Sequence, residues 1–130
     1  PDNEAMGSRA MGVSGAAAMT VDGVLAASGD PVVQLIKMDV DGHELEVLEG
    51  ARQVLIRCHP VIVMELAPYV FQPASNFDTM VRVLTELNYV FVPLGSTAEL
   101  PSDPARLRSL IPRLGSVNVV ALPTSAGTRE

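Results

Sequence analysis

The sequence predicts an α/β fold with a mostly parallel sheet whose last strand is antiparallel to its neighbours. First, β-branched apolar runs alternate along the chain with segments of helical period, which is typical of parallel α/β sheets. Second, residues 32–40 are apolar at successive positions, as in a strand that is buried on both faces. Third, the connection before the last apolar run lacks a long helix, which favours a hairpin-like return.

The first half of the chain contains two predicted helices around one predicted strand. Residues 20–28 form a short helix with Thr20 as its cap. Strand 32–40 ends at the Asp-Gly turn signal, and a single helix with one apolar stripe begins at His43 and stops before Pro60. Its glutamates lie early and its arginines late, as the helix dipole favours.

The second half continues the alternation. Ser75 or Asn76 is expected to cap the longer helix of this half. We expect irregular structure in residues 1–19 and a frayed tail at 124–130. The predicted elements are, in order, strand 61–65, helix 77–88, strand 89–94, a short helix within 104–111 and strand 116–122.

The composition excludes several classes of protein. The 130 residues suffice for one compact domain, and a net charge of −6 with nine scattered basic residues argues against non-specific nucleic-acid binding. No apolar run approaches the ~20 residues of a membrane span, and no basic segment followed by an apolar one marks a signal peptide. The single cysteine excludes an intrachain disulfide, so we expect a cytoplasmic protein without membrane or nucleic-acid partners.

Acidic residues stand at the ends of two predicted strands. Asp39 and Asp41 end the first, and Glu65 ends the next. Parallel neighbours lie ~4.8 Å apart and bind ligands beyond their carboxyl ends, so the three carboxylates are expected to share one rim. They could hold a divalent cation through oxygen ligands, or one of them could serve as a general base. His43 lies beside the same rim and is a second kind of proton acceptor.

A structural interpretation of these residues stands beside the functional one. Asp-Gly is an ordinary turn, and Asp39 or Asp41 could simply cap the helix that begins near His43. A histidine exposed in a first helical turn is more often inert than catalytic.

The stretch "LIKMDVDGHELEVLEGA" carries a more specific signal. It closely resembles the motif I-K-I-D-V-E-G-x-E, an apolar residue, then V-L-x-G-A of the FkbM family of methyltransferases. Asp41 stands where that family usually has Glu, which shortens the reach of the carboxylate by one methylene. "TVDGVL" upstream and "PVIVMEL" downstream resemble the flanking stretches of the family. The resemblance covers roughly residues 20–95.

This resemblance implies a class I methyltransferase fold, Rossmann-like, with a seven-stranded sheet. The chain would hold its C-terminal half, with a partial domain at 20–123. The family implies S-adenosylmethionine as methyl donor and a hydroxyl of a small molecule or sugar as acceptor. Asp39, Asp41, His43 and Glu65 would act as base or, in the case of the three carboxylates, as metal ligands. The Gly-rich turn that holds the donor belongs to the first half, so we expect the isolated chain to be inactive.

An alternative function belongs to a different class of protein. The chain could be a non-catalytic interaction or remnant domain that pairs with another subunit. In a chain that holds only half of the sheet, strand 32–40 would have an outer edge without a partner strand, and such an edge recruits one unless residues 1–28 fold back to cover it. We therefore expect association, with itself or another protein, through this strand.

Overall fold

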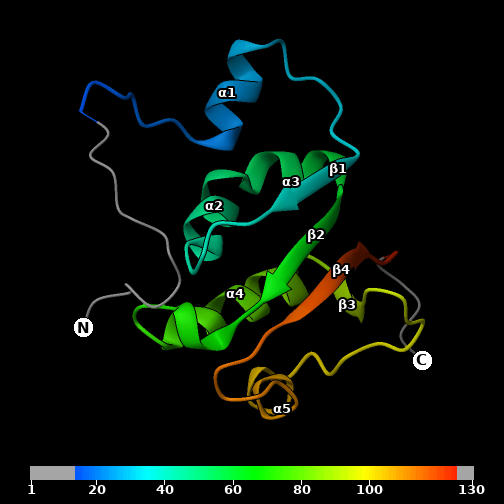
Figure 1. Cartoon of the computed structure of the whole chain (residues 1–130). Coiled ribbons are helices and arrows are strands. Elements are labelled where there is room, and N and C mark those ends of the chain that lie inside the picture. The colour runs from blue at the N-terminus through cyan, green and yellow to red at the C-terminus, as the bar shows by residue number, and fades with distance from the viewer. Residues whose placement is uncertain (1–13, 126–130) are drawn as a thin grey trace.

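A computed structural model of the protein describes residues 14–125. They form four strands and several helices (Figure 1). Residues 14–19 contain no helix or strand, while the predictions for 1–13 and 126–130 lie outside the described residues. The elements are α1 (Val21–Ala27), β1 (Leu35–Met38), α2 (Glu44–Gly50), α3 (Arg52–Cys58), β2 (Val61–Leu66), the 3-10 helix η2 (Pro68–Val70), α4 (Ser75–Glu86), β3 (Tyr89–Pro93), α5 (Pro104–Ser109) and β4 (Val117–Pro123).

The sheet is mixed, with strand order β1-β2-β4-β3. β1 and β2 are parallel, whereas β4 lies between β2 and β3 and is antiparallel to both. Strands β1, β2 and β3 therefore share one direction, and the last strand of the chain runs against them. This confirms the predicted α/β class and the antiparallel final strand.

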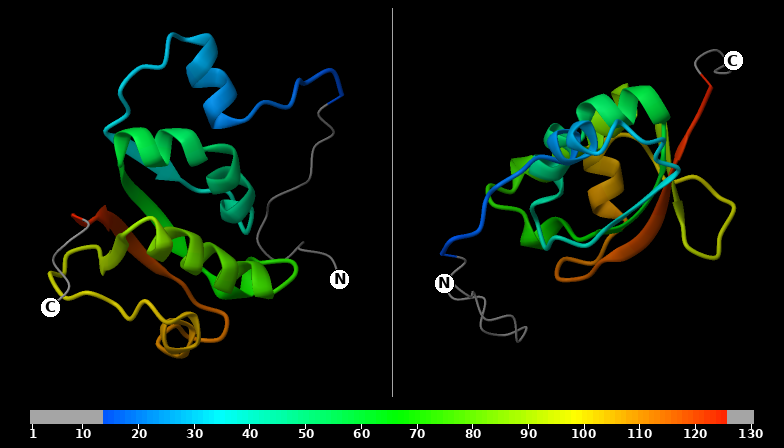
Figure 2. Two further views of the ribbon diagram at one scale, coloured as in Figure 1. Left: turned by 180° about the vertical axis from the view of Figure 1, so that it is seen from behind. Right: turned by 90° about the horizontal axis from the view of Figure 1, so that it is seen from above.

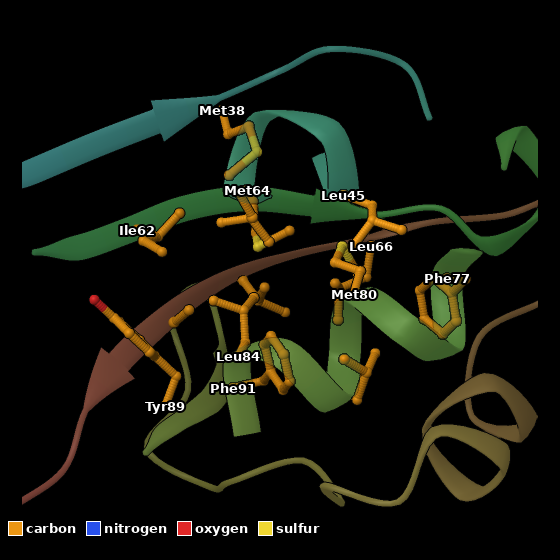
Figure 3. Packing of buried hydrophobic residues seen from close by; sticks show 14 of the residues in the cluster. Met38, Leu45, Ile62, Met64, Leu66, Phe77, Met80, Leu84, Tyr89 and Phe91 are labelled. Atoms are coloured by element: carbon orange, nitrogen blue, oxygen red, sulfur yellow. The ribbon is translucent and has the colours of Figure 1, made fainter. Parts of the chain in front are cut away.

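All helices described lie on one side of the sheet, as the right-hand view of Figure 2 makes visible. Burial alternates along β2, where Ile62, Met64 and Leu66 are buried and the residues between them are half-buried. The buried side chains meet α2 and α4 in one core (Figure 3). The predicted inward residues Phe77 and Leu84 of α4 belong to this core.

The prediction that strand 32–40 is buried on both faces is wrong. β1 has only four residues, and Leu35 is 59% exposed. The apolar sequence pattern is two-sided, but the described helices cover only one face of the sheet. The second apolar face is left open.

Of the helix caps predicted for α1 and α4, that of α1 is confirmed and that of α4 is wrong. Thr20 accepts a hydrogen bond from the Gly23 N–H, as predicted.

The proposed caps of α4 are wrong, because Ser75 and Asn76 lie inside the helix and Ala74 precedes it without a side-chain cap. The first N–H groups of α4 bond to the preceding turn instead: Asn76 donates to the Pro73 carbonyl and Phe77 to that of Ala74. The Asp103 carboxylate caps α5 by accepting from the Arg106 N–H.

The single helix expected from His43 to Pro60 is broken into α2 and α3 at Ala51. The carboxylate of Asp22, on α1, accepts hydrogen bonds from the backbone N–H groups of Gln53 and Val54, at 2.8 and 3.0 Å. It therefore caps α3 from another helix, and satisfies donors that a continuous helix would use internally. A Cβ at Gly50 would lie 3.1 Å from the Cβ of Thr20, so this glycine permits the close contact between α1 and α2.

No helix among residues 14–125 has the length and apolar character required to cross a lipid bilayer.

Candidate active site at the carboxyl ends of β1 and β2

Two of the predicted site residues line one small cavity. Asp39 follows β1 directly, and Glu65 is the last residue but one of β2. The parallel register pairs Met38 with Met64, so the next position on each strand brings Asp39 beside Glu65. The cavity measures about 100 Å³, and Lys37 and Asn118 also line it. Two carboxylates, an amine and an amide thus meet at one end of the sheet.

The cavity lies on the face of the sheet that the described helices leave open. Side chains alternate between the faces of a strand. Because Met38 and Met64 point into the helical core, Lys37 and Glu65 point to the opposite face. Asn118 of β4 is the register partner of Glu65 and shares that face. Four residues from three strands therefore present polar groups to one small volume.

The structure does not bring Asp41 and His43 to this cavity. Asp41 is exposed and has left-handed backbone, with φ of 48°, a conformation that Asp adopts more readily than most residues. The His43 side chain is 74% exposed, and its Nδ1 lies 3.6 Å from Oε1 of Glu46. The alternative role of Asp39 or Asp41 as a cap of α2 is wrong as well, since His43 precedes α2 and no side chain caps it.

The cation hypothesis concerned Asp39, Asp41 and Glu65. Only the first and last of these line the cavity. Among residues 14–125, no group of three or more His, Cys, Asp or Glu side chains is arranged to hold a metal ion.

Gly42 fixes the loop that leaves the site. It has φ of +98°, and a Cβ built on it would lie 2.4 Å from the carbonyl oxygen of Val70. Only glycine accommodates both the backbone and the contact. The loop after β1 therefore packs directly on η2, the segment that follows β2. This contact ties together the two connections that leave the carboxyl ends of β1 and β2.

This loop lies at the centre of the stretch that resembles the FkbM family. A comparison with known protein families tests that resemblance. Residues 6–91 match the methyltransferase FkbM domain. The chain belongs to the FkbM methyltransferase family. Separate comparisons with curated proteins and with solved structures find no match.

The fold explains several positions of the FkbM motif. Gly42 and Gly50 permit close approaches to Val70 and Thr20, and Asp22 of the upstream stretch caps α3. These residues hold α1, α2 and η2 around the loop that follows β1. Much of the motif therefore has a structural role, whereas Asp39 carries a charge to the cavity.

The sequence did not predict that Glu44, a residue of this FkbM domain, is buried. It is 4% exposed, and its Oε2 has no hydrogen-bond partner among the described residues. Burial raises the pKa of the Glu44 carboxyl, and the charge of Asp41 adds to the rise, while backbone groups of Glu44, Gly42 and Val40 oppose it. The available signal was its match to the motif, but its place in the first turn of a helix suggested only a favourable charge.

The methyl donor that this family implies is larger than the cavity. Sites for small molecules usually measure about 300–1,000 Å³, whereas the cavity at Asp39 and Glu65 has about 100 Å³. The residues around this cavity therefore do not form a complete site for S-adenosylmethionine.

Proposed function

We propose that this chain is a domain of an S-adenosylmethionine-dependent O-methyltransferase that modifies a hydroxyl of a small molecule or sugar. Membership of the FkbM methyltransferase family supports methyl transfer. The observation that carries the choice of residues is the meeting of Asp39 and Glu65 in one cavity at the carboxyl ends of parallel strands. Ligands of open α/β sheets bind at such ends.

In this proposal Asp39 and Glu65 handle the proton of the acceptor. A hydroxyl oxygen that receives a methyl group must lose its proton. A carboxylate within hydrogen-bond reach accepts that proton and also orients the oxygen. Asn118 and Lys37 supply donors that hold the same oxygen in place. Asp41 and His43 lie outside the cavity and have no direct part in this proposal.

We further propose that the four strands are the C-terminal half of a class I methyltransferase sheet. The strand order, the antiparallel β4 between β2 and β3, and the open face support this. Among the described residues β1 pairs with β2 alone, so its outer edge is available to a further strand. The first half of such a sheet would complete the donor site. This proposal accounts for a cavity that is too small for the whole cofactor.

The open edge and face also favour a second candidate function. A domain with these surfaces could serve as a non-catalytic module that pairs with another subunit. This function needs the edge of β1 but not the carboxylates of the cavity. The two candidates are therefore separable by experiment.

The test titrates S-adenosylmethionine, by calorimetry, into the 130-residue chain and into the full-length gene product that carries it. We expect the chain alone to bind more weakly than micromolar affinity, which corresponds to about −8 kcal/mol. We expect micromolar binding by the full-length product and transfer of labelled methyl to hydroxyl compounds. Micromolar binding by the chain alone would contradict the half-sheet proposal. A full-length product that binds no cofactor would favour the interaction module.

A further inference from the structure

A second, larger hollow lies near the carboxyl end of β2, and the FkbM motif does not account for it. It is an open groove of about 760 Å³ between η2, the first turn of α4, and α5 with the turn that follows it. This volume falls in the usual range for small-molecule sites, about 300–1,000 Å³. The groove is therefore large enough for a ligand that the small cavity cannot hold.

The walls of the groove combine apolar surface with positive charge. Pro68, Tyr69, Ile111 and Pro112 are among the apolar residues that line it. Asp78, Arg108 and Arg113 are the charged residues, and Asp78 forms an ion pair with Arg108. Arg113 forms no ion pair with any residue of 14–125, so the groove has one cation in excess. A guanidinium can bind a carboxylate or a phosphate through two parallel hydrogen bonds.

The positive charge of this region is unusual for the chain. Its net charge is −6, yet three of its nine basic residues fall between positions 106 and 113, and no acidic residue occurs from 104 to 129. The segment 104–113 is therefore positively charged, whereas the chain as a whole is negatively charged. Charge complementarity selects an anionic occupant for the groove.

The groove and the candidate active site both lie near the carboxyl end of β2. Pro68 lies three residues after Glu65, so their Cα atoms are at most about 11 Å apart. The contact between Gly42 and Val70 holds η2 against the loop that follows β1. The groove lies on the side of the sheet that carries the helices, whereas the cavity of Asp39 and Glu65 lies on the open face, so the two sites are separate.

We infer that the groove binds a small amphipathic anion, with an apolar or aromatic body against Tyr69 and Pro112 and an acidic group on Arg113. This inference concerns binding alone and is independent of the proposed function.

The experiment measures binding of 4-hydroxybenzoate to the 130-residue chain by saturation-transfer NMR. The neutral 4-hydroxybenzamide is the matched ligand, and 4-hydroxyphenyl phosphate distinguishes a phosphate from a carboxylate. Arg113→Gln removes the cation, and Arg113→Lys keeps the charge. Arg106→Gln is the control, because Arg106 is a nearby arginine on α5 that does not line the groove.

We expect an anion to bind, its affinity to fall about tenfold or more in Arg113→Gln, and Arg113→Lys to keep part of it. Arg106→Gln tests whether the loss of affinity is specific to Arg113. The neutral ligand tests whether binding depends on the anionic group. No saturable binding of either anion, equal binding of the benzamide, or an equal loss in Arg106→Gln would overturn the proposal.

Discussion

Gly42 lies so close to Val70 that a Cβ at position 42 would come within 2.4 Å of the Val70 carbonyl oxygen. The contact joins the loop after β1 to η2, two segments that each follow a strand of the candidate active site. Neither residue is chemically reactive. The contact sets the distance between the two loops that leave the carboxyl ends of β1 and β2.

Gly42→Ala should destabilise the protein more than a change of backbone conformation alone explains. A non-glycine residue in the left-handed region costs roughly 1–2 kcal/mol, and at Gly42 the collision with Val70 adds to that cost. Gly95→Ala is the matched control, because Gly95 has φ of +79° and a Cβ at this position would meet no atom within 4 Å. Urea unfolding measures both variants. Equal losses would contradict the close contact.

Asp39→Asn and Glu65→Gln should each lower methyl transfer by the full-length gene product by about 100-fold or more, the usual contribution of general acid–base catalysis. Asp41→Asn and His43→Asn should lose less, because neither residue lines the cavity. Glu99→Gln, an exposed loop residue, controls for loss of negative charge. The measurement is the initial rate with labelled methyl donor. Full activity of both cavity variants would exclude them as the proton acceptors.

The sequence predicted the order and type of most elements because they depend on local signals. Thr20 caps α1 as its residue type suggests, and runs of β-branched and apolar residues located β2 and β4. The break at Ala51 was not predictable in this way, since it accompanies hydrogen bonds from Gln53 and Val54 to Asp22, a distant residue in the chain. The open face of β1 was missed for a similar reason. An apolar side chain reports a tendency to be buried, but not whether a covering element is present.

Only part of the candidate site was predictable from the sequence. Asp39 and Glu65 follow from strand ends in a parallel register, which the sequence pattern indicates. The positions of Asp41 and His43 depend on a left-handed turn of two residues, Asp41 and Gly42, which turns the chain away from the cavity. The burial of Glu44 depends on tertiary packing around that turn, so its first-turn position alone did not reveal it.

Glu44 should make the stability of the protein depend on pH. Burial raises the pKa of its carboxyl above the ordinary value of 4.5. Between the unfolded and the folded pKa the native state binds more protons than the unfolded state, so stability falls as pH rises through this window. Glu44→Gln cannot ionise, and should therefore gain stability relative to the wild type as pH rises from about 4.5 toward neutral.

Urea unfolding at a series of pH values gives the difference between Glu44→Gln and the wild type. Glu49→Gln, an exposed residue on the same helix, should keep the pH profile of the wild type. A difference that stays constant across the series would show that the Glu44 carboxyl is not shifted upward by burial.

The edge of β1 should cause the 130-residue chain to associate at micromolar concentration. Among the described residues the outer edge of β1 has no partner strand, and Leu35 and Val32 are 59% and 77% exposed beside it. Exposed apolar edge strands pair with other chains, and lysine on an edge opposes such pairing. Leu35→Lys should therefore shift the mass measured by light scattering toward that of the monomer.

Leu110→Lys places the same charge at a leucine of matched exposure, 61%, at the end of α5, and should leave association unchanged. A wild-type chain that stays monomeric at micromolar concentration would contradict this prediction. Equal effects of the two lysine variants would assign the association to a surface other than β1.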